Sequence, residues 1–165
     1  MATRAFSSAD VVKLLGITPV YLNALVHREL YGIKASISER SEGKLRIFSE
    51  EDVFGIALVW MLFEAGLRTQ SIREILLQLV HSDNANAAAE YLMRPGSAHL
   101  VIVRESGKTT KKTRAKLRVE AVLTEDLMES IEEFVDKYPS ANILLVPAGA
   151  RFVEVEKKIA AMYGD

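Results

Sequence analysis

The pattern of apolar and polar positions predicts two short helices at the start of the chain. The run Ser7-Ser8-Ala9-Asp10 is a capping-box pattern, and an apolar stripe follows it as far as Gly16, a natural helix stop. A second helix start comes at Thr18, which can cap, with Pro19 at the first helical position. The apolar stripe of this second helix is Leu22, Leu25 and Val26. Two short helices joined by Gly16-Ile17-Thr18 predict a helix-turn-helix.

The pattern changes after the second helix to the alternation of a two-sided strand. Apolar and polar residues alternate over 33–38, residues 39–44 are polar, and Leu45-Arg46-Ile47-Phe48 alternates again. This arrangement predicts a β-hairpin with its tip between Glu39 and Lys44.

Helical spacing returns after the hairpin. Ser49-Glu50-Glu51-Asp52 is a second capping box, with acidic residues at the positive end of the helix dipole, and Gly66 ends this helix. Thr69 caps the next helix, and residues 87–93 predict one more short helix before Pro95-Gly96. The apolar faces are Val53, Ile56, Ala57, Trp60 and Phe63 in the first helix and Ile72, Ile75, Leu76 and Leu79 in the second.

Beyond Pro95-Gly96 the chain predicts a small α+β unit. Residues 99–103 are a compact apolar run, and residues 117–123 alternate as a second strand. Thr124 caps a helix that ends at Tyr138-Pro139, and residues 143–146 read as a buried strand. A last helix presents Phe152, Val155, Ile159 and Met162 on its apolar face. The predicted order is β-β-α-β-α.

Composition indicates a globular protein and excludes several kinds of site. Among the 165 residues 49% are hydrophobic, four are proline and none is cysteine. The chain therefore has no disulfides, thiolate zinc sites, iron–sulfur clusters or cysteine nucleophile. The N-terminus lacks the apolar core of a signal peptide, and Glu64 or Gln78 interrupts the longest apolar runs. We therefore expect a soluble, cytoplasmic protein without a membrane partner.

The net charge of −1 conceals an uneven distribution. Residues 96–120 carry seven basic and two acidic side chains, whereas residues 121–165 carry four basic and nine acidic ones. Residues 1–80 are balanced, with nine of each sign. A DNA-binding protein needs a basic face and not a basic total, so overall neutrality does not exclude DNA binding.

No pattern of catalytic or metal-ligating residues stands out. His27, His81 and His99 are far apart and lack the spacing of metal ligands, and the chain has no nucleophile elbow, phosphate-binding glycine loop or zinc-protease motif. The acidic residues of the helix after Thr124 are most simply its solvated face, although the pattern leaves a carboxylate pair open. These residues are Glu125, Asp126, Glu129, Glu132 and Glu133. We predict a non-enzyme with no cofactor and no metal.

The order helix, turn, helix, hairpin, helix, helix resembles the MerR family of winged-helix transcription regulators. The most specific part is the run Arg46-Ile47-Phe48-Ser49-Glu50-Glu51-Asp52-Val53, with its arginine, aromatic residue and acidic cap. Over residues 6–79, further matches are Phe6, Val11, Leu15, Gly16, Leu22, Leu45, Leu62, Gly66, Leu67, Ile72 and Ile75. The chain departs from the family at Asn23 and Ala24, where the family has arginine and tyrosine, and at Glu29, where it has glycine. The family's long dimerisation helix and metal-sensing cysteines are also missing.

The resemblance gives the predicted elements a domain organisation. We expect residues 1–80 to form a MerR-like winged helix-turn-helix DNA-binding domain, and residues 81–96 to connect it to the rest. Residues 97–165 would form a small β-β-α-β-α domain for dimerisation or effector binding. The fold class is therefore mainly α with an α+β part.

The resemblance also implies which residues meet double-stranded DNA. The second helix would enter the major groove and the hairpin would act as the wing on the flanking backbone. Asn23 can contact adenine through two hydrogen bonds, and Thr18 or Tyr21 can bind phosphate. The predicted DNA-binding residues are Thr18, Tyr21, Asn23, His27 and Arg28 around the second helix and Lys34, Arg40, Lys44 and Arg46 on the wing.

Each of these residues also has a simpler interpretation. The wing charges can be a solvated hairpin face, Arg46 can brace the wing through an internal hydrogen bond, and Asn23 and Tyr21 can be plain surface residues. The basic stretch from Arg104 to Arg118 can bind nucleic acid, but it lacks interleaved aromatic residues and reads better as an exposed loop between two strands. The aromatic residues Phe54, Trp60 and Phe63 are expected in the core.

Three functions fit this pattern. The first is a MerR-like transcription regulator that binds DNA as a homodimer, with an unidentified small-molecule effector as a further partner. The second is an architectural or adaptor protein, of the nucleoid, segregation or phage-packaging kind, that uses the same head. The third is a small-molecule binder or enzyme with an accessory DNA-binding head, for which the sequence offers no catalytic residues.

Overall fold

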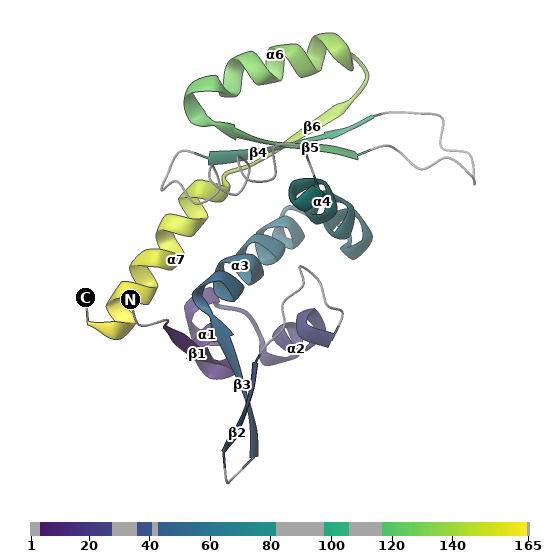
Figure 1. Ribbon diagram of the computed structural model, residues 1–165. Coiled ribbons are helices and arrows are strands. Elements are labelled where there is room, and N and C mark those ends of the chain that lie inside the picture. Colours follow the sequence, from purple (N-terminus) through teal and green to yellow (C-terminus); the bar gives the residue numbers. More distant parts are fainter. Residues whose placement is uncertain (1–3, 28–35, 41–42, 82–97, 106–116, 165) are drawn as a thin grey trace. The chain divides into compact units, whose positions relative to one another are not determined.

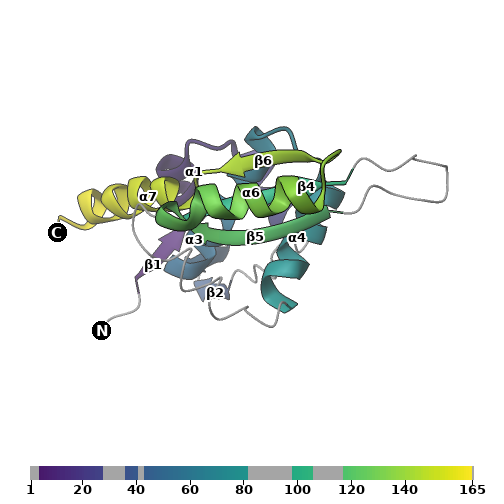
Figure 2. The same ribbon diagram turned by 90° about the horizontal axis from the view of Figure 1, so that it is seen from above.

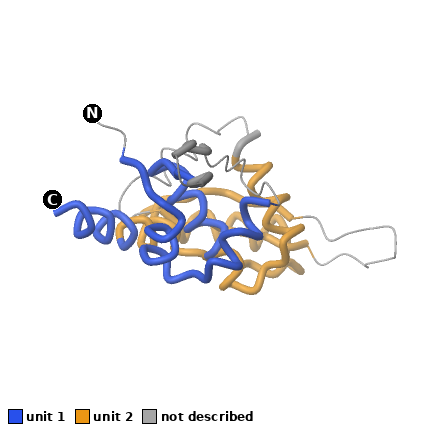
Figure 3. The backbone as a smooth tube through the Cα atoms, turned by 90° about the horizontal axis from the view of Figure 1, so that it is seen from below, with its two compact units in different colours: residues 1–60, 154–165 blue, residues 61–153 orange. Residues whose placement is uncertain are grey.

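The computed structural model describes residues 4–27, 36–40, 43–81, 98–105 and 117–164 (Figure 1). The predicted helix over residues 87–93 lies outside these ranges. The described chain is mostly helical, with two small antiparallel sheets. It divides into two compact units, residues 1–60 with 154–165 and residues 61–153 (Figure 3). This division runs through two helices, and it differs from the boundary near residue 80 that the sequence suggested.

Unit 1 begins with β1 (Ala5–Ser7), α1 (Ser8–Leu15) and α2 (Pro19–His27). It continues through β2 (Ser36–Arg40), β3 (Gly43–Ser49) and most of α3 (Glu50–Glu64), and it ends with the last part of α7 (Ala148–Tyr163). The predicted helix-turn-helix is confirmed, since α1 ends at Leu15, α2 begins at Pro19 and the two helices are bent by 113°.

Both predicted capping boxes of unit 1 are present. The Ser7 backbone N–H donates to the carboxylate of Asp10 over 2.8 Å, and the Asp10 N–H donates back to the Ser7 hydroxyl over 3.3 Å. Ser49 and Asp52 repeat the arrangement at 2.8 and 3.1 Å. Each box satisfies two N–H groups that a helix start otherwise leaves without partners. Gly16, at φ 67°, closes α1 in the left-handed conformation that glycine adopts without steric cost.

The sheet of unit 1 has the strand order β1-β3-β2. The predicted hairpin is confirmed, but its strands run further than predicted, because Glu39 pairs with Lys44 and Arg40 with Gly43. Figure 1 shows this hairpin projecting beyond α1 and α2. The sequence did not predict β1, which is three residues long and pairs Phe6 with Phe48 in the core. A strand this short shows no alternation by which it can be found.

The end of α7 completes unit 1 by contacting its first strand. The hydroxyl of Tyr163 donates a hydrogen bond to the carbonyl of Ala5 over 2.9 Å, and its ring meets Phe6 edge-on with centroids 5.7 Å apart. Arg4 lies over the same ring at 5.5 Å. These contacts explain why residues 154–165 belong with unit 1 and not with the sheet of unit 2 that precedes them in sequence.

Unit 2 contains the end of α3, then α4 (Thr69–His81), β4 (Ala98–Arg104), β5 (Leu117–Leu123) and the 3-10 turn η2 (Thr124–Asp126). It continues with α6 (Leu127–Lys137), β6 (Asn142–Val146) and the start of α7. The predicted order β-β-α-β-α is confirmed. The strand order is β5-β4-β6, fully antiparallel, with β4 in the centre. Figures 1 and 2 show α6 over one face of this sheet and α4 on the other side.

Alternation along β4 supplies a core on each face of the sheet. Val101 and Val103 are fully buried and pack with Val122 against residues of α6 and its flanks. Leu100 and Ile102, which are also buried, point to the opposite face because successive strand residues alternate. On α4, the predicted apolar face of Ile72, Ile75, Leu76 and Leu79 is buried as well.

The side chain of Gln78 closes the outer edge of β5. Its amide Nε2 donates to the carbonyl of Leu117 over 2.8 Å, and its Oε1 accepts from the N–H of Val119 over 3.2 Å. The amide therefore makes the two hydrogen bonds that a neighbouring strand would make. Open strand edges invite pairing with other chains, so this contact protects β5 while anchoring α4.

Replacing Gln78 with alanine is expected to lower the free energy of unfolding by about 1–2 kcal/mol, because two partly buried backbone groups lose their partners. Urea denaturation followed by circular dichroism measures the change. Gln70→Ala, at an exposed position of the same helix, is the matched control and should be near neutral. Equal stability of the two variants would contradict the role of Gln78.

Candidate nucleic-acid interface

One side of α2 faces solvent and the other faces the core. Leu22 and Leu25 are buried, at 2% and 3% exposure. The residues at positions i, i+3, i+4 and i+7 on the opposite side share one face because of the helical repeat. We call this face the α2 outer face; it consists of Val20, Asn23, Ala24 and His27. Its side chains are exposed except for the half-buried Ala24, so this side of the helix is open to a partner.

Thr18 holds the start of α2, as predicted. Its hydroxyl oxygen accepts a hydrogen bond from the N–H of Tyr21 over 3.2 Å, and Pro19 occupies the first helical position. The hydroxyl of Thr18 keeps its own hydrogen to donate, and the residue is exposed beside the α2 outer face. A helix N-terminus with an exposed donor is suited to an anion such as a phosphate.

A hydrogen bond joins α2 to the hairpin strand β3. The guanidinium Nη1 of Arg46 lies 2.6 Å from Oδ1 of Asn23, across 23 positions of sequence. Arginine has only donors, so the amide of Asn23 must present its oxygen to Arg46 and its Nδ2 amine elsewhere. Sequence reasoning allowed both an internal brace and a phosphate contact for Arg46. The structure shows the brace, and the other guanidinium N–H groups are further donors.

Tyr21 is turned away from the α2 outer face. Its ring packs edge-on against Trp60, with centroids 4.5 Å apart and planes at 69°, and both residues are half-buried. A phosphate contact by Tyr21 would therefore come from its hydroxyl alone. Among the aromatic residues expected in the core, Phe54 is buried but Phe63 is 47% exposed. The core prediction is wrong for Phe63, which lies one residue from the C-terminal end of α3, where the helix leaves the core.

The structure brings together some of the predicted DNA-binding residues and leaves others undescribed. Thr18, Asn23 and His27 are exposed on or beside the α2 outer face, and Arg46 adjoins it. Arg40 and Lys44 lie near the hairpin tip by strand register, but their side chains are outside the described part of the chain. Arg28 and Lys34 lie wholly outside the described residues.

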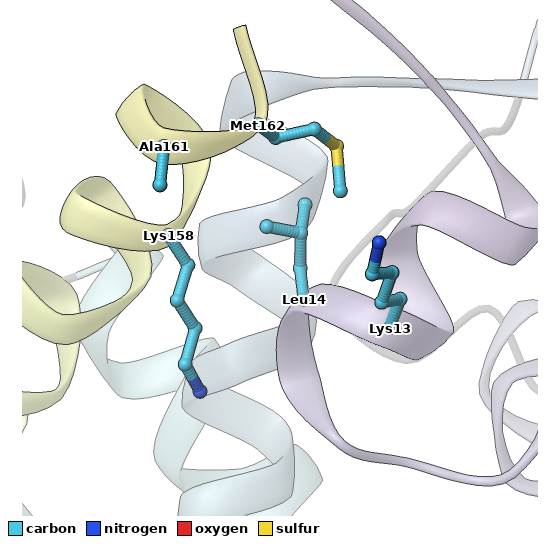
Figure 4. Close-up of a pocket in the computed structure, with 5 residues that line it drawn as sticks. All are labelled: Lys13, Leu14, Lys158, Ala161 and Met162. Carbon is cyan, nitrogen blue, oxygen red and sulfur yellow. The ribbon is translucent and has the colours of Figure 1, made fainter. Parts of the chain in front are cut away.

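A concavity in unit 1 lies between α1 and the end of α7. It has a volume of about 440 Å³ and is lined by Lys13, Leu14, Lys158, Ala161 and Met162 (Figure 4). The figure shows the two lysine chains on either side of Leu14, pointing in opposite directions. The Nζ of Lys158 pairs with Glu154 over 2.7 Å. The amines therefore do not converge on one ligand group.

The described part of unit 2 contains a charged cluster between β4, β5 and α6. The guanidinium of Arg118 donates a hydrogen bond to the carboxylate of Glu105 over 2.9 Å and lies 5.0 Å from the ring centre of Tyr138, and this hydrogen bond to Glu105 raises the pKa of Arg118. Burial, followed by the nearby charge of Glu133, raises the pKa of Glu120. Arg118 is therefore engaged within unit 2. Residues 106–116 of the predicted basic loop lie outside the described chain.

The described residues form neither a metal-binding cluster nor a single membrane-spanning helix. No group of three or more histidine, cysteine, aspartate or glutamate residues there could hold a metal ion. None of the described helices alone is long and apolar enough to cross a membrane, although the bent pair α1 and α2 meets these criteria when taken together. The acidic residues from Glu125 to Glu133 are exposed, as predicted for a solvated face.

Comparison with known proteins gives no family assignment. No protein-family model matches the chain, and no curated protein sequence matches it. One similar solved structure is the "Crystal structure of HiNmlR, a MerR family regulator lacking the sensor domain, bound to promoter DNA". The likeness has a TM-score of 0.41 and 16% identity, and it covers 53% of this chain and 64% of that one, less than two thirds of its length. A TM-score below 0.5 does not establish a shared fold, so functional inference rests on the residues of this chain.

Asn23→Ala and Arg46→Ala are expected to be non-additive in the free energy of unfolding, with a coupling of about 0.5–1 kcal/mol for an exposed, charge-assisted hydrogen bond. A double-mutant cycle by urea denaturation measures this coupling. Asn23→Ala combined with Lys157→Ala, at an exposed position of α7, is the control and should be additive. Additivity of the Asn23 and Arg46 substitutions would show that the bond is not maintained in solution.

Proposed function

We propose that the protein binds double-stranded DNA as a transcription regulator of the winged helix-turn-helix class. In this proposal α2 enters the major groove with the α2 outer face toward the bases, and the β2–β3 hairpin is the wing beside it. The observation that carries the proposal is that α2 exposes a whole face while Arg46 fixes its Asn23 from the adjacent hairpin. An exposed helix face next to a projecting hairpin that carries Arg46 suits a grooved, anionic partner. The cytoplasm is the expected location.

The residues of this interface divide by the part of the duplex that they would contact. In this proposal Asn23 and His27 face the bases, and Thr18, which caps the start of α2, donates to phosphate, with Tyr21 as a further candidate for a phosphate contact. Lys34, Arg40 and Lys44, on the wing by sequence, would supply salt-dependent phosphate contacts, and Arg28, which directly follows α2 in sequence, would adjoin the reading helix. Arg46 would hold Asn23 and offer its remaining N–H groups to the backbone.

The alternative is an architectural or adaptor protein that uses the same interface without a fixed operator. No observation in the described chain favours it over a regulator. Genome-wide footprinting separates the two, because a regulator should occupy a small number of sites and an architectural protein should be scattered widely.

Replacement of Lys44 with glutamine is expected to weaken DNA binding alike for all sequences. The slope of log affinity against log salt should fall by about one, the loss of one phosphate contact. Fluorescence anisotropy with a labelled duplex at several salt concentrations measures the slope. Lys157→Gln on α7 removes the same charge at an exposed position outside the interface and should leave the slope unchanged. Wild-type affinity that does not depend on salt would refute the docking model.

We also propose that unit 2 supplies the homodimer, with β6 as the interface. Within the described residues β6 pairs with β4 alone, whereas the corresponding edge of β5 is closed by Gln78. The strand Asn142–Val146 carries no charge, and Leu145 on it is 41% exposed. An uncharged open edge favours pairing with a second strand, and two antiparallel copies of the same strand are complementary to each other.

Replacement of Leu145 with arginine is expected to shift the protein from dimer to monomer, because it places a charge in the strand pair. Sedimentation equilibrium over a range of protein concentrations measures the change. Leu77→Arg, at a 51% exposed position of α4, is the control and should leave the association state unaltered. A wild-type protein that is monomeric at every concentration would contradict the proposed dimer.

A further inference from the structure

Val20 is the most exposed of the large hydrophobic side chains in the described chain, at 78%. Single exposed apolar residues are common and need no explanation by themselves. The position of Val20 is what distinguishes it, because it lies in the first turn of α2, on the same face as Asn23. An apolar group at this point would be the first part of the α2 outer face to meet a base edge.

The amide of Asn23 is already engaged on one side. An asparagine that reads adenine with two hydrogen bonds accepts from the base amine and donates to N7. Here one of the two lone pairs of the Asn23 Oδ1 atom already accepts from Arg46 over 2.6 Å, and this bond fixes the orientation of the amide. The remaining donor, Nδ2, can reach an acceptor such as a purine N7 or the thymine O4. The face therefore presents a methyl-bearing side chain and, one helical turn away, a hydrogen-bond donor.

We propose that Val20 reads the 5-methyl group of a thymine in the major groove, beside a base that accepts a hydrogen bond from Asn23. Three residues of helix rise about 4.5 Å, close to the 3.4 Å step between stacked bases, so the two side chains match neighbouring base pairs. Thymine is the only base with an apolar group in that groove, and aliphatic side chains pack on it. This assignment rests on the proposed function, since it names the base feature that the α2 outer face recognises.

The test uses the full-length chain and a duplex selected for tight binding from random DNA. Each thymine of the selected site is replaced in turn by deoxyuridine, which removes one methyl group and leaves base pairing intact. We expect one position in each half-site at which wild-type affinity falls by about fourfold, the loss from exposing one buried methyl. Val20→Ala should bind the original and the substituted duplex equally well. Leu77→Ala, which trims another exposed aliphatic residue, should keep the wild-type fourfold difference.

The outcomes separate this assignment from the proposed function. If the wild type binds the selected duplex but deoxyuridine has no effect at any position, the methyl assignment is wrong and DNA binding stands. If Val20→Ala keeps the same loss as the wild type, another side chain reads the methyl group and the assignment to Val20 is wrong. If the random pool yields no specifically bound duplex, the proposed function itself fails. If Val20→Ala binds the deoxyuridine duplex as tightly as the wild-type protein binds that same duplex, the variant is folded.

Discussion

The hydrogen bond between Arg46 and Asn23 fixes the orientation of the Asn23 amide on the α2 outer face. Without it, α2 and the hairpin would be linked through α1, which contacts both α2 and β3. With it, a side chain of β3 sets the direction of an amide on α2. A bond between exposed side chains contributes little to stability. Its larger effect is on the chemistry of the α2 outer face, because it turns the Oδ1 atom of Asn23 toward Arg46 and directs the Nδ2 atom elsewhere.

Much of the fold could be predicted because its signals are local. Both capping boxes are four-residue patterns, and Gly16 ends α1 by its own backbone freedom. The periodicities of α4 and β4 each show in a single window of sequence. The strand β1 could not be found, since its pairing with β3 depends on residues about forty positions later. The grouping of residues 154–165 with residues 1–60 in unit 1 depends on contacts at still longer range.

The candidate site was predictable in its residue types but not in its geometry. Thr18 acts as a cap because capping needs only the three following residues. For Arg46 the sequence left two roles open, and only the folded pairing of β3 with α2 brings it to Asn23. Tyr21 is a second such case, since its partner Trp60 is 39 positions away and spacing alone does not show that the ring turns inward.

The contact of Tyr163 with Ala5 has a consequence for how the chain is made. A strand near the start of the sequence and a helix end near residue 163 complete the same unit, so that unit cannot finish folding on the ribosome until residue 163 has emerged. The sheet around β4, which needs nothing beyond residue 153, is free to form earlier. Synthesis from N- to C-terminus usually lets the first domain fold first. In this protein unit 1 is completed last, and a nascent chain that stalls in α7 would carry α2 and its exposed face on an incompletely folded unit.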